Sequence, residues 1–333
     1  MQLKNNTKIY KDFWELSSKE RTKRKIIKSE IRKDYLDDRL VVFAPNRKWK
    51  IKTSGSREPA SQNKEENCRL CPENIDKESF SLKVPEDGSA WEIKVVGNKF
   101  STFSQTNKNA RGIQEIVIET PRHGEGLEEM PLDKIQKIIE VYIERTKKLS
   151  KEKRVNYIEI FKNHGEHAGA SIQHEHSQIF ATEIIPLRIL ERLKKEKEYP
   201  GCIYCDIIKK EKKGPRKIFE DKNFLVLCPY ASERSYEVMV LPKRHLDNIS
   251  KLNAEEKKSL AKIFKSVLRG VKNLGLSYNF YFHEVVRVSD QHVYLKIQPR
   301  SNVWAGLELG AGLIINSVPP EESADYYKKY FKR

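Results

Sequence analysis

The residues best suited to chemistry lie in one short stretch, where a Gly/Ala/Ser-rich turn leads into His174-x-His176-x-Gln178. If positions 174–180 form a strand, alternate side chains point to one face, about 7 Å apart. Two imidazoles and an amide on one face make a poor hydrophobic core. They suit a site that acts on phosphates. An imidazole can attack phosphorus and later act as the leaving group, because its pKa lies near the working pH.

The turn before this strand is rich in small and hydrogen-bonding residues. Glycine allows close backbone approach, and amide or hydroxyl groups donate hydrogen bonds, so the combination suits a bound phosphate. Ser171 has the alternative role of capping the turn. The candidate phosphate-binding residues are Asn163, Gly165, Gly169, Ala170 and Ser171.

Four of the five cysteines occur in two Cys-x-x-Cys pairs. In a chain without an export signal, such pairs favour metal sites over disulfides. Zinc in a closed site takes four Cys or His ligands, often one Cys-x-x-Cys and two distant histidines. We therefore expect two zinc ions per chain. The two ligand sets are Cys68, Cys71, His123 and His174, and Cys202, Cys205, His245 and His292.

Each metal assignment has an alternative. The pairs could be reduced thiols that lie near surface histidines without a metal. In the second set, His283 lies close to His292 in the sequence and could replace His245 as a ligand. His164 and His167 are expected to be loop residues near the active site.

The two metal sets belong to two copies of one unit. Each copy runs from a Cys-x-x-Cys pair through strands and a proline-histidine segment to a helix, a strand and a histidine-bearing strand. Hydrophobic periodicity predicts the helices over 132–149 and 254–274, the second with Asn253 as N-cap. Strands separated by one long helix and short turns indicate an α+β fold, an antiparallel sheet with a helix on one face.

Length and charge limit the possible functions. A chain of 333 residues can form two domains with proper cores. The net charge of +17 comes from lysines interspersed with glutamates, as on solvated helix faces, so a nucleic-acid partner is not expected. No run of about 18 apolar residues predicts a membrane span, and no apolar signal core lies near the N-terminus, so we expect a cytoplasmic protein.

The stretch 163–178 follows the pattern Asn-x-Gly-x-x-x-Gly-x-Ser-x-x-His-x-His-x-Gln at every fixed position. It resembles the active-site signature of galactose-1-phosphate uridylyltransferases and of the related ADP-glucose phosphorylases, members of the histidine-triad (HIT) superfamily. The resemblance implies tandem HIT-like domains that form one continuous unit. The implied divisions are a basic arm at 1–30, a catalytic domain at 31–195, and a second domain with a degenerate site at 196–333.

The resemblance also implies roles for the central residues. His176 would be the nucleophile that takes a nucleotidyl group from a nucleotide sugar and releases sugar 1-phosphate. Gln178 would donate to a phosphate oxygen, while Ser171 and the backbone at 169–170 would hold other oxygens. The second copy has Tyr294 and Lys296 in place of His176 and Gln178, so it cannot perform this covalent chemistry.

Further contacts are implied at a greater distance from the histidines. Arg32 and Arg47 resemble arginines that meet phosphates and base, and Asn98 opens a segment that resembles the loop packed on the nucleobase. The run 304–312 resembles a segment that reaches the sugar of the neighbouring subunit in a homodimer. Glu308 in that run would accept hydrogen bonds from sugar hydroxyls, or would only cap a turn.

These features favour a ping-pong nucleotidyltransferase, with UDP-glucose:hexose-1-phosphate uridylyl transfer as the leading activity. The alternative within the same chemistry is adenylyl transfer from ADP-glucose to inorganic phosphate. A third possibility is a zinc-stabilised nucleotide- or RNA-binding protein without catalysis, against which His176 and Gln178 argue.

Overall fold

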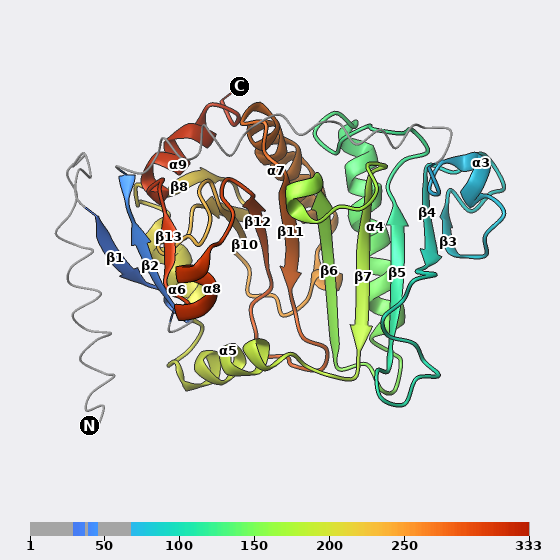
Figure 1. Cartoon of the computed structure of the whole chain (residues 1–333), viewed down its shortest axis with the longest axis horizontal. Helices are drawn as coiled ribbons and strands as arrows, with labels where there is room; N and C mark the ends of the chain where they lie inside the picture. Colours follow the sequence, from blue (N-terminus) through green and yellow to red (C-terminus); the bar gives the residue numbers. More distant parts are fainter. Residues whose placement is uncertain (1–28, 37–38, 46–67, 333) are drawn as a thin grey trace.

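The computed structural model describes residues 29–36, 39–45 and 68–332. Within these ranges, ten strands form one antiparallel sheet (Figure 1). Residues 1–28 of the predicted basic arm and Arg47 lie outside the described residues, whereas Glu30, at the end of that arm, begins β1 (Glu30–Lys33). In spatial order the strands are β3 (Phe80–Val84), β4 (Ile93–Gly97), β5 (Gly112–Ile118), β7 (His176–Thr182), β6 (Tyr157–His164), β11 (Tyr278–His283), β12 (Tyr294–Pro299), β10 (Val238–Pro242), β9 (Phe224–Leu227) and β8 (Lys217–Glu220).

The order of the strands confirms the two copies. Five strands from each half follow one another across the sheet, and the halves join where β6 pairs antiparallel with β11. Phe161 pairs with Tyr281 at this junction. Each of them also pairs with a residue of the next strand in its own half. Phe161 pairs with Gln178 on β7, and Tyr281 pairs with Lys296 on β12. The α+β fold with one continuous tandem unit is therefore confirmed.

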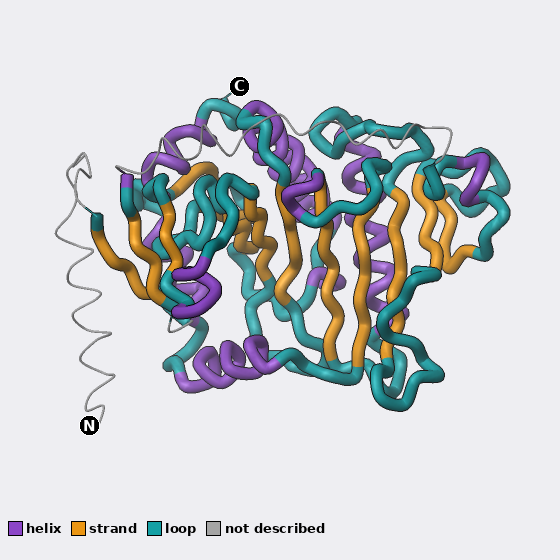
Figure 2. Tube along the Cα trace, in the orientation of Figure 1, coloured by secondary structure: helices purple, strands orange, loops and turns teal. Residues whose placement is uncertain are grey.

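Two long helices cover one face of the sheet, α4 (Leu132–Leu149) and α7 (Ala254–Asn273). Both lie behind the strands in Figure 2. Their apolar stripes pack with inward-facing strand residues such as Ile160, Ile179 and Phe280 into one core. Asn253 and Glu256 form the capping box that begins α7, as the sequence predicts for Asn253.

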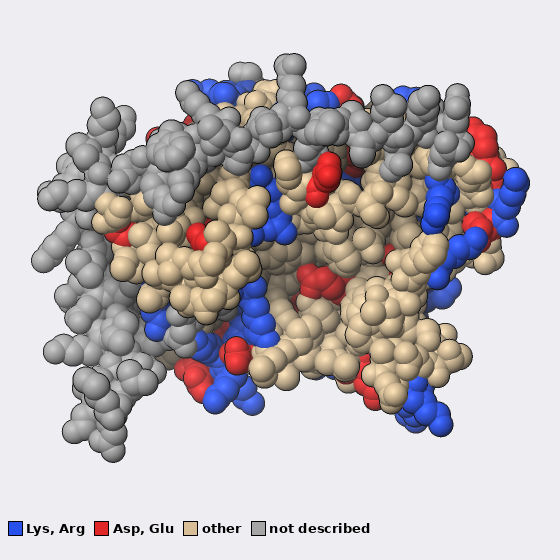
Figure 3. Space-filling view, in the orientation of Figure 1, with Lys and Arg blue, Asp and Glu red and all other residues tan. Residues whose placement is uncertain are grey.

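The opposite face of the sheet is open over its centre. Figure 3 shows it hollowed over β6 and β11, with lysine and arginine side chains on the side nearer β10 and β12. None of the described helices is both long and apolar enough to cross a bilayer. The remaining elements are smaller and lie around the large sheet. They are β1 (Glu30–Lys33), β2 (Leu40–Phe43) and β13 (Ile314–Asn316), which form a second sheet, with α3 (Pro72–Ile75), η3 (Glu166–Ala168), α5 (Leu187–Glu198), α6 (Ile203–Glu211), η4 (Ile249–Lys251), α8 (Gly306–Ala311) and α9 (Pro320–Lys328). Of these, η4 and α9 pack beside α4 and α7.

Candidate active site and metal centres

His176 begins β7 and is held in one tautomer. Its Nδ1 lies 2.7 Å from the carbonyl oxygen of His174. A carbonyl can only accept, so Nδ1 carries the proton and Nε2 keeps its lone pair. Burial lowers the pKa of His176, with the Lys162 charge acting in the same direction, which favours the neutral imidazole. The unprotonated Nε2 is the state that a nucleophilic histidine requires.

The strand register places the other candidate residues on the face of His176. Gln178 pairs with Phe161 across β7 and β6, so continuing the register by two residues puts Asn163 beside His176. Asn163 in turn pairs with Asn279 on β11. These side chains point away from α4 and α7 because their neighbours in sequence fill the core. The site is thus a row of polar groups across the centre of the sheet.

Gln178 is half-buried, and its amide has no hydrogen-bond partner within the described part of the chain. A primary amide offers two donors. Both lie two residues from His176, and their expected bond to a phosphate oxygen remains a prediction.

The loop between β6 and β7 depends on two glycines. Gly165 has φ +83°, and a Cβ there would lie 2.2 Å from Ser277 Oγ. Gly169 has φ +81° and ends η3 in the left-handed region. Both positions therefore favour glycine, and a side chain at Gly165 would also collide with its neighbour.

The backbone amides of this loop bond to carbonyls of the loop itself. Gly169 N donates to Glu166 O at 2.8 Å, and Ala170 N donates to Gly165 O at 3.2 Å. These two amides hold the loop in this structure, and the phosphate cradle expected at Gly169 and Ala170 remains a prediction. Ser171, the other candidate of this loop, is exposed.

A buried ionic network anchors the catalytic strand from the helix-covered side. Lys162 forms ion pairs with Glu119 and Glu175. Glu175 also accepts from His164 Nδ1 at 2.8 Å. Burial opposes the charge of Glu175, but the ion pair with Lys162 and the bond from His164 lower its pKa to about 2. This network fixes the residue between His174 and His176, and it places His164 at the end of β6 rather than in the loop.

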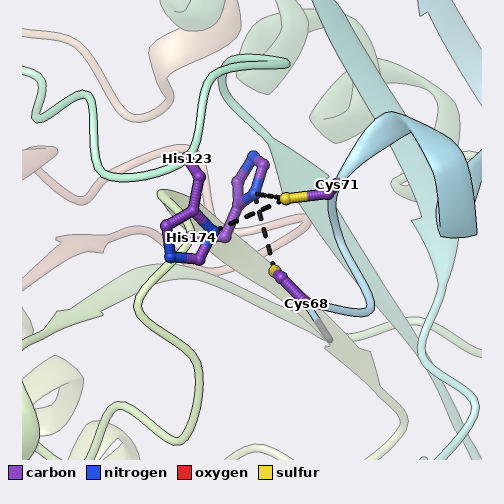
Figure 4. Close-up of side chains that lie close together, drawn as sticks. All are labelled: Cys68, Cys71, His123 and His174. Atoms are coloured by element: carbon purple, nitrogen blue, oxygen red, sulfur yellow. Dashed lines mark hydrogen bonds between the residues drawn. The ribbon is translucent and has the colours of Figure 1, made fainter. Parts of the chain in front are cut away.

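The first Cys/His cluster brings together Cys68, Cys71, His123 and His174 (Figure 4). His174 Nδ1 lies 3.7 Å from Cys68 Sγ and 3.4 Å from Cys71 Sγ, and His123 Nδ1 lies 3.5 Å from Cys71 Sγ. His174 Nε2 lies 2.7 Å from the carbonyl of Thr120 and so carries the proton. Nδ1 is left with a lone pair that faces two thiols. This arrangement of ligand atoms suits a bound metal ion better than a set of separate hydrogen bonds.

The second cluster repeats this geometry. His292 Nδ1 lies 3.5 Å from Cys202 Sγ and 3.6 Å from Cys205 Sγ, and His245 Nδ1 lies 3.7 Å from Cys205 Sγ. His292 Nε2 is again held by a backbone carbonyl, that of Pro242, at 2.9 Å. In each cluster the four ligand atoms all lie within 4.8 Å of one another, so each could hold a metal ion.

The structure decides between the two histidines considered for the second cluster. His283 is buried and stacks on the ring of Tyr294, with ring centroids 4.7 Å apart. His245 is the fourth member of the cluster with Cys202 and Cys205. His283 is therefore not part of this set.

The second half presents a different chemistry at the position of His176. Tyr294 lies there with the Arg192 guanidinium 5.8 Å from its ring centroid. Lys296, at the position of Gln178, is buried in an ion pair 3.1 Å from Glu237. Neither offers a free nucleophile, as the sequence predicts for a degenerate site.

The outlying candidates are engaged within the chain. Arg32 is buried, pairs with Glu321 at 3.0 Å and packs on two aromatic rings. Asn98 Oδ1 accepts from Phe100 N, which presents a largely exposed ring with 75% of its surface free. Glu308 caps α8 by accepting from Ala305 N at 3.0 Å. Their expected contacts with substrate remain predictions.

Sequence reasoning missed Asn279 and Arg300. Asn279 Nδ2 donates to Asn163 Oδ1 at 2.7 Å and to Ala168 O at 2.9 Å, and its own Oδ1 accepts from Arg300 Nε. The alternation of the expected strand 278–282 could have placed Asn279 on the open face. Only the pairing of β6 with β11 brings it to Asn163.

Two family models match the chain. The first, galactose-1-phosphate uridyl transferase, N-terminal domain, matches residues 18–186. The second, described as scavenger mRNA decapping enzyme C-term binding, matches residues 201–303. Together they follow the division into two halves that the sheet shows.

Similar proteins span nearly the whole chain. A galactose-1-phosphate uridylyltransferase from Thermotoga maritima is 30% identical over 305 residues, 83% of this chain and 93% of that protein. An ADP-glucose phosphorylase from Arabidopsis thaliana is 28% identical over 89% of this chain and 91% of its own length. A crystal structure of an Arabidopsis thaliana ADP-glucose phosphorylase with bound ADP-glucose superposes with a TM-score of 0.78, at 26% identity, covering 91% of this chain and 99% of that one. The chain thus belongs to the galactose-1-phosphate uridylyltransferase family.

Proposed function

We propose that the protein is a nucleotidyltransferase that acts on nucleotide sugars and passes the nucleotidyl group through His176. The observation that carries the proposal is the bond between His176 Nδ1 and the His174 carbonyl, which leaves a neutral Nε2 beside Asn163 and Gln178. An enzyme of this kind agrees with both families of relatives. A non-catalytic binding protein would have no need of a nucleophile held in one tautomer.

The reaction has two displacements. Nε2 attacks the α-phosphorus, the bond from that phosphorus to the bridging oxygen breaks, and sugar 1-phosphate leaves with the electron pair. In the second step, a phosphate oxygen of the acceptor attacks the same phosphorus and the bond to Nε2 breaks. Gln178, Asn163 and Ser171 would bind the non-bridging oxygens during both steps.

Uridylyl transfer between UDP-glucose and a hexose 1-phosphate is the first candidate reaction. It is supported by the relative from Thermotoga maritima, a galactose-1-phosphate uridylyltransferase. Adenylyl transfer from ADP-glucose to phosphate is the second. The fold match to an ADP-glucose phosphorylase over nearly its entire length favours it. Both candidates use the same histidine and differ in base and acceptor.

Labelled substrates test the proposal. Purified protein is mixed separately with UDP-glucose and ADP-glucose labelled in the nucleotidyl phosphate, and label on the denatured protein is measured. Retention from one donor identifies the base, and release by hexose 1-phosphate or by phosphate identifies the acceptor. No retained label from either donor would overturn the assignment of a covalent histidine.

We also propose zinc in both Cys/His clusters. Thiolate and imidazole ligands favour zinc, and a closed four-ligand site is typical of a structural ion. In the first cluster the ion would be held by Cys68, Cys71, His123 and His174. It would hold the residue two positions before His176, so that the start of β7 keeps its register. The catalytic domain would span 31–195 and the degenerate domain 196–333.

Gln178→His is expected to convert part of the transfer activity into hydrolysis. A histidine there could accept a proton from water beside the nucleotidyl group, whereas the amide of Gln178 cannot act as a base. The measurement is the release of free nucleotide from the labelled intermediate without acceptor. Gln178→Asn is the matched control, and equal release from both variants would contradict the role of Gln178 in sparing the intermediate.

A twofold dimer is proposed as the active form, with the 304–312 segment near the partner's sugar site. α8 presents an apolar surface, with Leu307 44% and Leu309 72% exposed, which suits burial against another chain. Light scattering tests this state directly, and a fully active monomer would exclude a shared site.

Glu308→Gln is expected to weaken use of sugar 1-phosphate more than formation of the nucleotidyl intermediate. Replacing a charged acceptor for a hydroxyl costs about 1.5–3 kcal/mol, roughly a 10- to 100-fold loss in the sugar step. The cap on α8 is also affected, so Glu308→Asp, which keeps the charge, serves as control. Half-reaction kinetics give the readout, and an unchanged sugar dependence would limit Glu308 to capping α8.

A further inference from the structure

Asn279 connects the second half of the sheet to the loop of the active site. One amide nitrogen donates to Asn163 Oδ1 at 2.7 Å and to the Ala168 carbonyl at 2.9 Å. The side chain is 91% buried, since only 9% of its surface is exposed. Both hydrogens of the Asn279 amide are thus donated to the first half of the sheet, one to the Asn163 side chain and one to the Ala168 carbonyl.

The direction of these bonds is set by Arg300 together with the Ala168 carbonyl. A guanidinium has only donors, so the atom of Asn279 that meets Arg300 Nε must be the oxygen. The nitrogen of Asn279 must then face Asn163 and Ala168, and Asn163 must present its oxygen in return. Arg300, which only donates, and the Ala168 carbonyl, which only accepts, together fix the orientation of the two successive amides.

The consequence appears at Asn163. With Oδ1 occupied on the β11 side, its Nδ2 has no acceptor among the residues that the structure describes and turns away from β11. His176 lies on the other side of Asn163 in the register of β6 and β7. A free amide donor beside a nucleophilic histidine suits the negatively charged oxygens of a phosphoryl group.

The charge of Arg300 has no carboxylate partner within the described ranges. Its recorded bond is to the neutral Asn279. Arg234 lies nearby, with its guanidinium 4.1 Å from the centroid of the Trp304 ring and NH1 bonded to Asn302 O at 2.8 Å. Burial lowers the pKa of Arg234 to about 10, and the charge of Arg300 contributes to this shift. Positive charge is thus concentrated behind the two amides, where it polarises them toward an anion.

We propose that Arg300 and Asn279 are positioning residues that hold Asn163 with its amide nitrogen toward the reacting phosphoryl group. The inference rests on the proposed function, since it assigns a partner to that nitrogen. The degenerate half of the protein would then take part in catalysis by fixing an amide of the active half. No contact between Arg300 and substrate is required.

A double-mutant cycle tests whether Asn279 acts through Asn163. Asn279→Asp presents only acceptors, so Asn163 must turn its nitrogen toward the carboxylate and its oxygen toward the phosphoryl group. Formation of the labelled nucleotidyl enzyme is expected to slow on the order of 10- to 100-fold. In the background of Asn163→Ala the same change should have little further effect, because no amide is left to orient. Asn273→Asp, which alters an exposed amide bonded to Tyr330, is the matched control and should leave the rate unchanged.

Arg300 is tested in parallel, which also covers a failure of Asn279→Asp to fold. Arg300→Met removes the donor and should slow formation of the intermediate like Asn279→Asp, whereas Arg300→Lys keeps a donor and should restore most of the rate. Metal content and melting temperature of each variant are measured as well. Full additivity with Asn163→Ala, or normal rates in Arg300→Met, would overturn the proposal. A wild-type enzyme that forms no nucleotidyl intermediate would overturn the proposed function instead.

Discussion

His176→Gly is expected to abolish nucleotidyl transfer while the protein stays folded and keeps its metal. Without Nε2 no covalent intermediate can form, and removal of a covalent nucleophile costs on the order of 10⁵-fold or more in rate. Fold and metal should survive because the ring's recorded bond goes to a backbone carbonyl rather than to a ligand side chain. Single-turnover transfer from labelled nucleotide sugar gives the readout.

His176→Asn provides a second variant with a polar side chain near the original volume. It can donate to the His174 carbonyl, so it retains the local bond but has no nucleophilic nitrogen. Both variants should show the wild-type metal content and melting temperature. Normal turnover in either of them would exclude His176 as the nucleophile, whatever the base of the substrate.

The long amphipathic elements were predictable from local pattern. The helix expected over 132–149 has those bounds in the structure, and the helix expected over 254–274 ends one residue earlier. Each has a continuous apolar stripe with helical periodicity, so the sequence alone predicts a helix without knowledge of its tertiary contacts. The two Cys/His clusters were also predictable, because Cys-x-x-Cys spacing and the repeated order of histidines carry the information in sequence.

Features set by long-range pairing were not predictable. The bond between Asn279 and Asn163 joins residues 116 positions apart and depends on β6 meeting β11. The choice of His245 over His283 also depends on tertiary structure, because His245 follows β10 and reaches the second cysteine pair, whereas His283 ends β11 and stacks on Tyr294. The internal bonds of the loop at 165–170 follow from two positive φ angles that local composition permits but does not specify.

Cys68→Ser is expected to lower stability and activity together. The side chain is buried, and its sulfur faces His174, whose other nitrogen is held by the Thr120 carbonyl. A serine hydroxyl is a poor zinc ligand, so the first cluster should lose its ion while the second keeps one. A closed zinc site contributes several kcal/mol to folding, which corresponds to a melting temperature lower by about 10 °C or more. Transfer should fall as well, because His174 supplies the carbonyl that holds His176.

Cys228→Ser separates the loss of a metal ligand from the loss of a buried thiol. Cys228 is fully buried and lies outside both clusters, so its variant should keep about two metal ions per chain even if it is less stable. Cys202→Ser should lose the second ion and keep more transfer activity than Cys68→Ser, since Tyr294, not a nucleophile, follows His292. Elemental analysis of protein purified without added metal gives the counts. Two reactive Cys-x-x-Cys pairs in native protein without metal would contradict the metal sites. Equal activity losses in Cys68→Ser and Cys202→Ser would show that the first ion has no special relation to His176.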